Sequence, residues 1–380
     1  MSNDLQARAW VEVDLDALRD NYRAVRGAVG DRPAIIAMVK ADAYGLGADR
    51  VVRALEPLEP WGYGVATADE GAALREFGVR RPIVVFGPLP SAAVVLAARS
   101  GLCATISDIT SLDQWAAAAT GGRLDFHVEI DTGMGRAGFD WRDTHDWSRA
   151  VQEIASRTKV RWTGIMTHFH GADSADATAT AAQWERFQDA LAQLPVPRAE
   201  LMVHAANSAA ALRWPEYAAD AVRPGIFLYG GHPAQHSSAA GPKPVVAVRA
   251  RLVLVRDVAP GSTVGYGATH VSTGWERWGT LAIGYGDGLP RRLGNRGSAI
   301  VRGEVVPFVG RISMDMTVVD ITGVPAARVG DVVTLIGSDG GASITLDEVA
   351  AQAETISYEI LTGLRPRLPR VEKVAWSETD

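Results

Sequence analysis

The sequence predicts an α/β fold: an N-terminal (β/α)8 barrel of the TIM type followed by a smaller, mainly β domain. Short apolar runs alternate with helical segments over more than half of the chain, which is the pattern of parallel strands joined by helices. From residue 245 onward the pattern changes to β-branched runs broken by turns, which favours antiparallel strands. The 380 residues exceed the usual size of one domain but fit a barrel plus a second domain.

The alternation begins with a helix that Asp14 can cap. Apolar residues then recur at steps of three and four, at Leu15, Leu18, Tyr22, Val25 and Val29. Short apolar runs predict eight strands, at residues 34–39, 61–66, 82–86, 102–107, 124–131, 160–168, 201–204 and 222–228. Helical segments between them include 69–77, 91–99 and 177–194, and several end at Gly78, Gly101 or Pro195. Eight such units predict a closed parallel barrel.

The domain boundary is expected at a linker, residues 231–244, which is rich in Gly, Pro, Ser and Ala. We therefore assign residues 1–240 to the barrel and residues 241–380 to the β domain, with the first residues of the chain able to join the β domain instead. One helix, at residues 346–354, interrupts the predicted strands of the second domain.

Composition argues against several functional classes. The chain is 47% hydrophobic and 22% charged with a net charge of −6, which is ordinary for a globular protein and lacks the basic face typical of nucleic-acid binding. No apolar stretch is long enough to span a membrane or to act as a secretory signal, so we expect a cytoplasmic protein without a membrane partner. The single cysteine, Cys103, precludes an intrachain disulfide and is expected to pack in the core.

The first strand carries a lysine at its exit, in the run AIIAMVKADAYGLG. Lys40 is expected to be partly desolvated there, which lowers the pKa of its amine and frees it for Schiff-base chemistry. Taken alone, a lysine whose stem covers apolar surface is the more ordinary interpretation. The neighbouring Tyr44, Gly45 and Gly47 favour a role in Schiff-base chemistry, because they make a turn where a ligand can approach the backbone closely.

Further unusual polar residues fall where the strands of such a barrel end, which is where active sites lie in this architecture. They are Arg136, His168, Asn207, Ser208 and Arg223, the last in a run RPGI that we place within the eighth strand. A lone histidine in an apolar run such as GIMTHFHG is more often a hydrogen-bonded core residue than a catalyst. The gathering of these polar residues at the strand ends is therefore stronger evidence for an active site than any one of them.

Ordered motifs along nearly the whole chain resemble those of the alanine racemases, pyridoxal-phosphate enzymes of fold type III. The motifs are VEVDLDALRDN, VKADAYGLG, DTGMGRAGF, MTHF, HAANSAA, VRPGIFLYG, VGYGATH, IGYGDG, GRISMD and ISYEILTGL. So many matches in order make coincidence an inadequate explanation. The resemblance implies a cytoplasmic racemase that uses pyridoxal phosphate, without a metal, to interconvert L- and D-alanine for peptidoglycan.

The resemblance also implies a role for each residue at the cofactor. Lys40 binds the cofactor covalently, and the remaining binding residues are Tyr44, His168, Asn207, Ser208, Arg223, Tyr358 and the backbone of Gly225 and Ile226. Arg223 faces the pyridine nitrogen and, because it stays protonated, makes the ring a weaker electron sink and limits transamination. Without the resemblance, Ser208 would be read as a helix cap, and Arg223 equally well as a salt-bridge residue.

Racemisation needs two bases on opposite faces of the substrate. By resemblance these are Lys40 and Tyr266, and the tyrosine reaches the pocket from the partner subunit, which implies a homodimer with shared active sites. A tyrosine titrates near pKa ~10 when unperturbed, so it needs the positive charge relayed by His168 and Arg223 to act as a base. On its own, Tyr266 would be an ordinary strand aromatic.

Substrate contacts are implied for Arg136, a planar partner for a carboxylate, and for the backbone of Met314. Residues at the entrance of the pocket are Tyr285, Arg291, Arg311 and Asp315. The alternative for the last two is a surface ion pair with each other.

The chain departs from the family at Glu129, where many members have a carbamylated lysine. We hypothesise that Glu129 supplies the negative charge that orients Arg136, and that it pairs with this arginine; the alternative is that it points elsewhere. His270 and Leu289 also depart from the family pattern near the expected entrance, which leaves the substrate range open.

Two other functions remain open. One is a broader amino-acid racemase, for example one acting on serine, and the other is a non-catalytic pyridoxal-phosphate carrier. Carriers resemble the barrel alone, so the second domain argues against that alternative. A decarboxylase of the same fold type fits less well, because Arg223 and Tyr266 match the racemase pattern.

Overall fold

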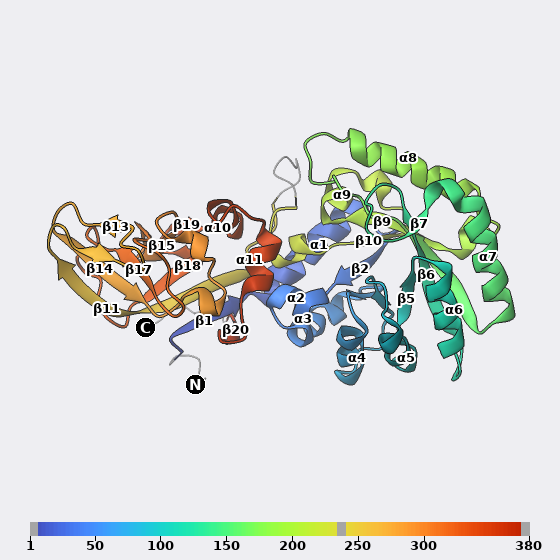
Figure 1. Ribbon diagram of the computed structural model, residues 1–380, viewed down its shortest axis with the longest axis horizontal. Helices are drawn as coiled ribbons and strands as arrows, with labels where there is room; N and C mark the ends of the chain where they lie inside the picture. The colour runs from blue at the N-terminus through green and yellow to red at the C-terminus, as the bar shows by residue number, and fades with distance from the viewer. Residues whose placement is uncertain (1–6, 234–240, 374–380) are drawn as a thin grey trace.

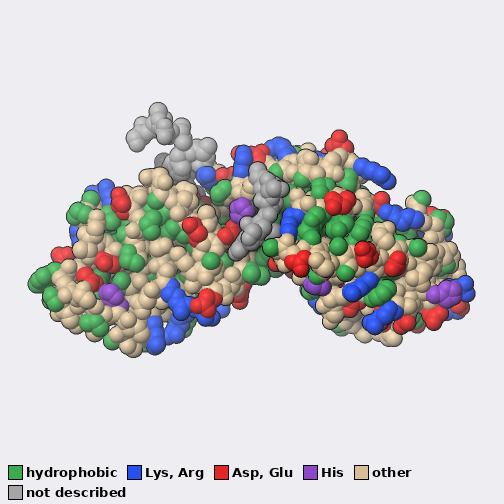
Figure 2. Space-filling model, turned by 90° about the horizontal axis from the view of Figure 1, so that it is seen from above, with side chains coloured by type: hydrophobic (Ala, Val, Ile, Leu, Met, Phe, Trp, Pro, Cys, Tyr) green, Lys and Arg blue, Asp and Glu red, His purple; other side chains and the backbone are tan. Residues whose placement is uncertain are grey.

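The computed structural model describes residues 7–233 and 241–373, which form two lobes joined by a narrower waist (Figures 1 and 2). One lobe is the barrel with its helices, and the other is built mainly of β-strands (Figure 1). Part of the predicted linker, residues 234–240, lies outside the described residues.

The predicted barrel is confirmed in the described part of the chain. Each of its eight strands pairs with the next in parallel, and the last pairs with the first to close the barrel. The strands are β2 (Ala34–Met38), β3 (Gly62–Val65), β4 (Ile83–Val85), β5 (Cys103–Ile106), β6 (Leu124–Asp131), β8 (Val160–Met166), β9 (Met202–Asn207) and β10 (Ala221–Arg223). A short strand, β7 (Phe139–Asp140), adds to β6 outside the closed ring.

Helices follow the strands and surround the barrel (Figure 1). They are α1 (Leu15–Val29), α3 (Ala48–Leu55), α4 (Ala68–Glu76), α5 (Ser91–Arg99), α6 (Ile109–Ala118), α7 (Thr144–Arg157), α8 (Thr178–Ala192) and α9 (Ser208–Arg213). The Asp14 side chain accepts a hydrogen bond from the backbone N–H of Ala17 at 2.8 Å, so the predicted cap of the first helix is confirmed.

The prediction that the eighth strand continues to residue 228 is wrong. Strand β10 ends at Arg223, and a 3-10 helix at Ile226–Tyr229 follows. Pro224 has no N–H to continue the ladder of hydrogen bonds, so the strand cannot extend through it as a central strand would. The chain turns into the pocket here, which places Gly225 and Ile226 beside the other strand ends.

The second lobe is an antiparallel sheet completed by both ends of the described chain. Strand β1 (Ala9–Val13) pairs antiparallel with the long β11 (Val246–Val258) and parallel with β20 (Arg370–Glu372). The other strands of this sheet are β14 (Glu276–Leu281), β15 (Ser298–Val301), β16 (Glu304–Pro307), β17 (Thr317–Asp320), β18 (Val332–Asp339) and β19 (Ala342–Ile344). Strands β12 (Thr263–Val264) and β13 (His270–Val271) form a separate two-stranded sheet. The predicted helix is present as α10 (Leu346–Gln352), and α11 (Ser357–Gly363) is a further helix that the sequence reading missed.

A large cluster of buried apolar residues runs through the barrel and into the β lobe. A smaller cluster in the β lobe consists of Val258, Val264, Trp278 and Val309. Cys103 is buried, as its apolar run predicts. Among the described residues, none of the helices combines the length and the hydrophobicity that crossing a membrane requires.

Candidate active site

A pocket of about 110 Å³ lies at the carboxyl ends of the barrel strands. It gathers most of the residues that the sequence singled out, although they come from distant parts of the chain. Those that line it are Lys40, Tyr44, Glu129, Arg136, His168, Asn207, Ser208, Arg223, Gly225, Ile226 and Tyr358. Met38, Phe86 and Met166 complete the lining with apolar surface.

The backbone that follows Lys40 is left-handed. Residues Ala41 to Tyr44 have φ between 53° and 57°, and Gly45 continues with φ 84°. A left-handed conformation costs a non-glycine residue about 1–2 kcal/mol, so this turn has to be held by its surroundings. The Asp42 side chain accepts a hydrogen bond from the backbone N–H of Ala48, beyond the turn, at 2.7 Å.

The half-buried amine of Lys40 makes no hydrogen bond or ion pair with any residue that the structure describes. Burial lowers the pKa of Lys40, and the positive charges of Arg136 and Arg223 lower it further, while the carboxylate of Glu70 opposes them. An amine with a lowered pKa is a nucleophile near neutral pH, so Lys40 is suited to react with a carbonyl group.

Tyr44, Ser208 and Gly225 form a cradle at one end of the pocket. The backbone N–H of Gly225 donates to Ser208 Oγ at 2.8 Å, which leaves the Ser208 hydroxyl proton available to a ligand. A Cβ at position 225 would lie 2.2 Å from the Tyr44 hydroxyl oxygen, so only glycine allows this approach. The Tyr44 ring stacks on Tyr229 with 4.5 Å between centroids.

Asn207, rather than Ser208, caps the helix that follows β9. Its side chain accepts a hydrogen bond from the backbone N–H of Ala210 at 3.1 Å. Ser208 is therefore released from the capping role that would otherwise explain it, and its hydroxyl serves the cradle.

Arg223 lies within a hydrogen-bonded series of three histidines, of which two are buried and His168 is half-buried. Its Nη1 donates to His204 Nδ1 at 2.8 Å, and its Nη2 donates to His168 Nδ1 at 3.1 Å. His204 Nε2 lies 2.9 Å from Nδ1 of His127. Because an arginine only donates, both nitrogens that face it are acceptors, and the neutral His204 and His168 carry their protons on Nε2. His204 then donates to His127, and His168 has an Nε2–H to offer to the pocket.

The three histidines linked to Arg223 are held neutral. Burial together with the charge of Arg223 lowers the pKa of His127 to about 4 and that of His168 to about 3, and it lowers the pKa of His204 well below its usual value. Burial lowers the pKa of Arg223 itself to about 10, so the guanidinium stays charged near neutral pH.

Glu129 supplies negative charge to the same pocket. Its side chain is buried, and its carboxylate accepts a hydrogen bond from Ser107 Oγ at 3.4 Å. Burial raises the pKa of Glu129, while Arg136 and Arg223 lower it. Within the described residues, Glu129 and Arg136 do not come within the 4.0 Å of a salt bridge, so the contact we hypothesised between them is not formed here.

The remaining predicted residues lie on the β lobe, away from this pocket. Tyr266 follows β12 with 65% of its surface exposed, and Met314 is 52% exposed. The backbone N–H groups of Tyr285 and Gly286 donate to the carbonyls of Ser313 and Met314, at 3.0 and 2.7 Å, so these two loops form one unit. Arg291 begins a 3-10 helix that continues to Leu293.

Three other residues of the β lobe have local roles. Asp315 forms an ion pair with Arg367 at 2.7 Å rather than with Arg311, which corrects our surface-pair alternative. His270 pairs with Glu276 at 3.1 Å, and Leu289 is buried.

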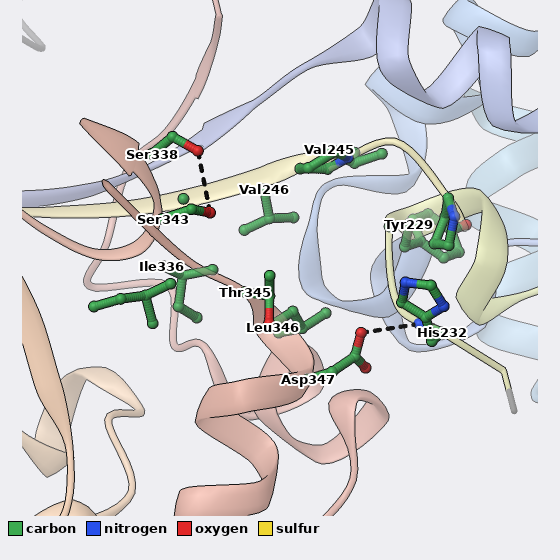
Figure 3. A pocket seen from close by; sticks show the side chains of 15 residues that line it. Tyr229, His232, Val245, Val246, Ile336, Ser338, Ser343, Thr345, Leu346 and Asp347 are labelled. Carbon is green, nitrogen blue, oxygen red and sulfur yellow. Dashed lines mark hydrogen bonds between the residues drawn. The ribbon is translucent and has the colours of Figure 1, made fainter. Parts of the chain in front are cut away.

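A second cavity, of about 170 Å³, lies between the two lobes (Figure 3). Apolar side chains such as Val245, Val246 and Leu346 line much of it, and the backbone N–H of His232 donates to Asp347 at 3.2 Å (Figure 3). None of the predicted site residues lines this cavity. We therefore place the reactive centre in the pocket at the strand ends.

Comparison with known proteins identifies the family. Residues 13–233 match the model of the alanine racemase N-terminal domain, and residues 245–372 match that of the alanine racemase C-terminal domain. The chain belongs to the alanine racemase family. The resemblance stated from the motifs is thereby confirmed.

The similarity to individual alanine racemases covers nearly the whole chain. An alanine racemase of Halothermothrix orenii is 36% identical over 378 residues, which cover 98% of this chain and 99% of that protein. The crystal structure of an alanine racemase from E. faecalis has a TM-score of 0.91 at 33% identity, with 98% of this chain and 100% of that chain covered. An alanine racemase from Bartonella henselae, solved with covalently bound pyridoxal phosphate, has a TM-score of 0.88 at 30% identity, with 97% of this chain and 100% of that chain covered.

Sequence reasoning missed several residues that shape this pocket. His127 and His204 lie in apolar strands and read as core residues, because nothing in the sequence shows that His204 contacts Arg223 on the adjacent strand. The contact of His127 with His204 likewise appears only in the structure. Glu70 reads as the N3 residue of a helix cap, and its contact with the turn after Lys40 appears only in the structure.

Proposed function

We propose that this chain catalyses the interconversion of L- and D-alanine with pyridoxal 5′-phosphate bound at Lys40. The observation that carries the proposal is the pocket itself, where an amine with a lowered pKa lies among Arg223, His168 and a cradle of hydroxyl groups. Family membership supports the reaction and the cofactor.

The residues present fit this cofactor. The free amine of Lys40 suits an aldehyde, and the hydroxyls of Tyr44, Ser208 and Tyr358 with the backbone at Gly225 and Ile226 suit a phosphate dianion. Asn207 and His168 lie alongside. The hydrogen bonds of Arg223 to described residues use Nη1 and Nη2, which leaves its Nε–H to meet the pyridine nitrogen. When bound, the cofactor would make the α-hydrogen of alanine acidic.

Two groups then move that proton. We propose that Lys40 Nζ acts on one face of the substrate and that Tyr266 of the partner subunit acts on the other, in a homodimer. Tyr266 is exposed and does not line the pocket of its own chain, which supports a role in the site of a partner. The Nε2–H of His168, fixed by Arg223, would donate to the tyrosine oxygen and favour its ionised form.

The substrate carboxylate is assigned to Arg136 and to the backbone N–H of Met314 from the partner subunit, and the entrance to Tyr285, Arg291, Arg311 and Asp315. Glu129 would orient Arg136 through charge across the pocket, since Arg136 acts on the pKa of Glu129. Glu129→Gln is expected to raise the KM for alanine more than it changes kcat. Unchanged kinetics would contradict the role of Glu129.

The setting of the reaction follows from the family. We propose a cytoplasmic enzyme that supplies D-alanine for peptidoglycan, without a nucleic-acid or membrane partner; acidic and basic side chains are interspersed on the face seen in Figure 2. Residues 1–240 and 241–380 remain our proposed domains, with β1 as a strand of the first part that completes the sheet of the second.

The decisive experiment follows exchange at the α carbon. The purified protein with bound cofactor is incubated in heavy water with L-alanine and, separately, with L-serine, while deuterium incorporation and chirality are recorded together. Deuterated D-alanine formed much faster than D-serine is the expected result. Comparable rates would favour the broader racemase, and bound cofactor without exchange on either amino acid would favour the carrier.

A further inference from the structure

The left-handed turn after Lys40 needs an anchor outside itself. Five consecutive residues from Ala41 to Gly45 have positive φ, and four of them are not glycine. Such a segment relaxes to ordinary conformations unless contacts hold it. The position of the Lys40 amine depends on this turn, because Lys40 is the residue immediately before it.

Glu70 supplies a contact at the start of the turn. Its Oε1 accepts a hydrogen bond from the backbone N–H of Ala41 at 2.7 Å. Its Oε2 accepts hydrogen bonds from the backbone N–H groups of Ala66 and Thr67, at 2.8 and 3.3 Å. One carboxylate therefore fastens the turn after β2 to the chain after the neighbouring strand, β3.

The same carboxylate acts on the charge of the lysine. Glu70 is the negative group that raises the pKa of Lys40 against burial and against the repulsion of Arg136 and Arg223. Glu70 can therefore act on the Lys40 amine in two ways. Its hydrogen bond to the backbone of Ala41 acts on the position of the amine, and its negative charge acts on the pKa of the amine.

We propose that Glu70 is a positioning residue for Lys40, whose carboxylate holds the left-handed turn in place for cofactor attachment. This inference rests on the proposed role of Lys40. The competing explanation is a purely structural one, in which Glu70 is the N3 member of a capping box with Thr67 and serves helix α4 alone.

The chain offers a matched control for that explanation. Glu348 is the N3 residue of a second capping box, at α10, where it accepts from the backbone N–H of Thr345 at 2.6 Å while Thr345 Oγ1 accepts from the N–H of Glu348 at 3.1 Å. Glu348 makes no hydrogen bond to the turn after Lys40. Removing it therefore tests the loss of a cap without the loss of the anchor.

The experiment compares Glu70→Ala, Glu70→Gln and Glu348→Ala in the full chain. Backbone amide exchange is measured for the peptide that contains residues 41–46, and pyridoxal phosphate affinity is measured by absorbance titration. We expect Glu70→Ala to accelerate exchange of this peptide at least tenfold and to weaken cofactor affinity at least tenfold. Glu348→Ala should change neither, although it lowers the melting temperature.

Glu70→Gln keeps one acceptor oxygen and the size of the side chain, so it remains informative if Glu70→Ala does not fold. It should give an intermediate acceleration of exchange. The proposal is overturned if the folded Glu70 variants behave like Glu348→Ala in both measurements. A wild-type protein that fails to bind pyridoxal phosphate would instead count against the proposed function, and the amide exchange would still decide whether Glu70 holds the turn.

Discussion

The guanidinium of Arg223 donates a hydrogen bond to Nδ1 of His204 across 2.8 Å, in a part of the barrel where both side chains are buried. This contact fixes the proton of His204 on Nε2 and directs it to His127. A permanent positive charge is thus surrounded by imidazoles that accept hydrogen bonds from it and stay neutral, with Glu129 as the nearby negative charge that acts on Arg223.

Acidification should destabilise the protein through these histidines. The pKa of His127 is about 4 in the folded chain, against 6.5 for a free histidine. Below pH 6.5 the unfolded chain therefore binds a proton that the folded chain refuses until about pH 4, so stability falls as the pH is lowered across this window. His127 contributes up to about 1.4 kcal/mol per pH unit of the free energy of unfolding.

The measurement is urea unfolding between pH 5 and pH 8. His127→Gln can still accept a hydrogen bond from His204 but cannot titrate. The free energy of unfolding should therefore change less steeply with pH, by up to about 1.4 kcal/mol per pH unit. The control is His145→Gln at an exposed position, which should leave the slope as in the wild type. An unchanged slope in His127→Gln would show that His127 is not held neutral.

A buried carboxylate, Asp287, should contribute far more to stability than an exposed one that shares its partner. Asp287 is fully buried, accepts a hydrogen bond from Arg8 at 2.5 Å and forms an ion pair with Arg367 at 3.3 Å. Asp315, 53% exposed, pairs with the same Arg367. Removing the buried member leaves charges and a backbone N–H without partners, so Asp287→Ala should lower the free energy of unfolding by about 2–4 kcal/mol. Asp315→Ala should lower it by less than about 1 kcal/mol.

Urea titrations at one pH compare the two variants directly. Because Asp287 also accepts from the backbone N–H of Gly284 at 3.0 Å, its loss should loosen the loop that presents Tyr285. If both variants lowered the free energy of unfolding equally, the burial of Asp287 would not strengthen its contribution to stability.

The proposed division of the active site between subunits can be tested by mixing. Lys40→Ala and Tyr266→Phe should each abolish racemisation, because each removes one of the two bases. If Tyr266 serves the partner subunit, heterodimers of the two variants contain one complete site, and random exchange of subunits should restore about a quarter of the wild-type activity per chain.

The assay measures D-alanine formation after the two inactive proteins are unfolded together and refolded. Each variant refolded alone is the control and should remain inactive. A mixture without activity, from variants that fold and dimerise normally, would place Tyr266 in the site of its own chain. An active Tyr266→Phe protein would remove the tyrosine from the mechanism.

The sequence predicts the barrel well because its evidence is local. Runs such as 34–39 and 124–131 carry the hydrophobicity of buried strands, and Asp14 carries the geometry of a cap. The end of the eighth strand was misjudged because hydrophobicity continues through Ile226 and Phe227, and the missing N–H of Pro224 weighs more than that pattern.

The parts of the site that the sequence could not reveal depend on contacts between distant segments. The left-handed turn at Ala41 to Tyr44 contradicts local preference, since alanine and aspartate in this run favour right-handed conformations. Glu70 contacts the turn that follows a neighbouring strand. His204 contacts His127 on a strand with which its own strand does not pair. Such contacts follow from strand order and register, which a single sequence does not specify.

Gly225 should tolerate no side chain without loss of the cradle. A Cβ at this position would lie 2.2 Å from the Tyr44 hydroxyl oxygen and 3.0 Å from its Cζ, and the Tyr44 ring is held against Tyr229 and cannot simply withdraw. Gly225→Ala should therefore displace the hydroxyl that we assign to the cofactor phosphate and weaken pyridoxal phosphate binding at least tenfold, about 1.4 kcal/mol.

Gly274→Ala is the matched control, because a Cβ there meets nothing within 4 Å. Both affinities are measured by absorbance titration beside urea unfolding, which separates a lost cradle from a misfolded barrel. Wild-type affinity in a folded Gly225→Ala protein would mean that Tyr44 does not bind the phosphate.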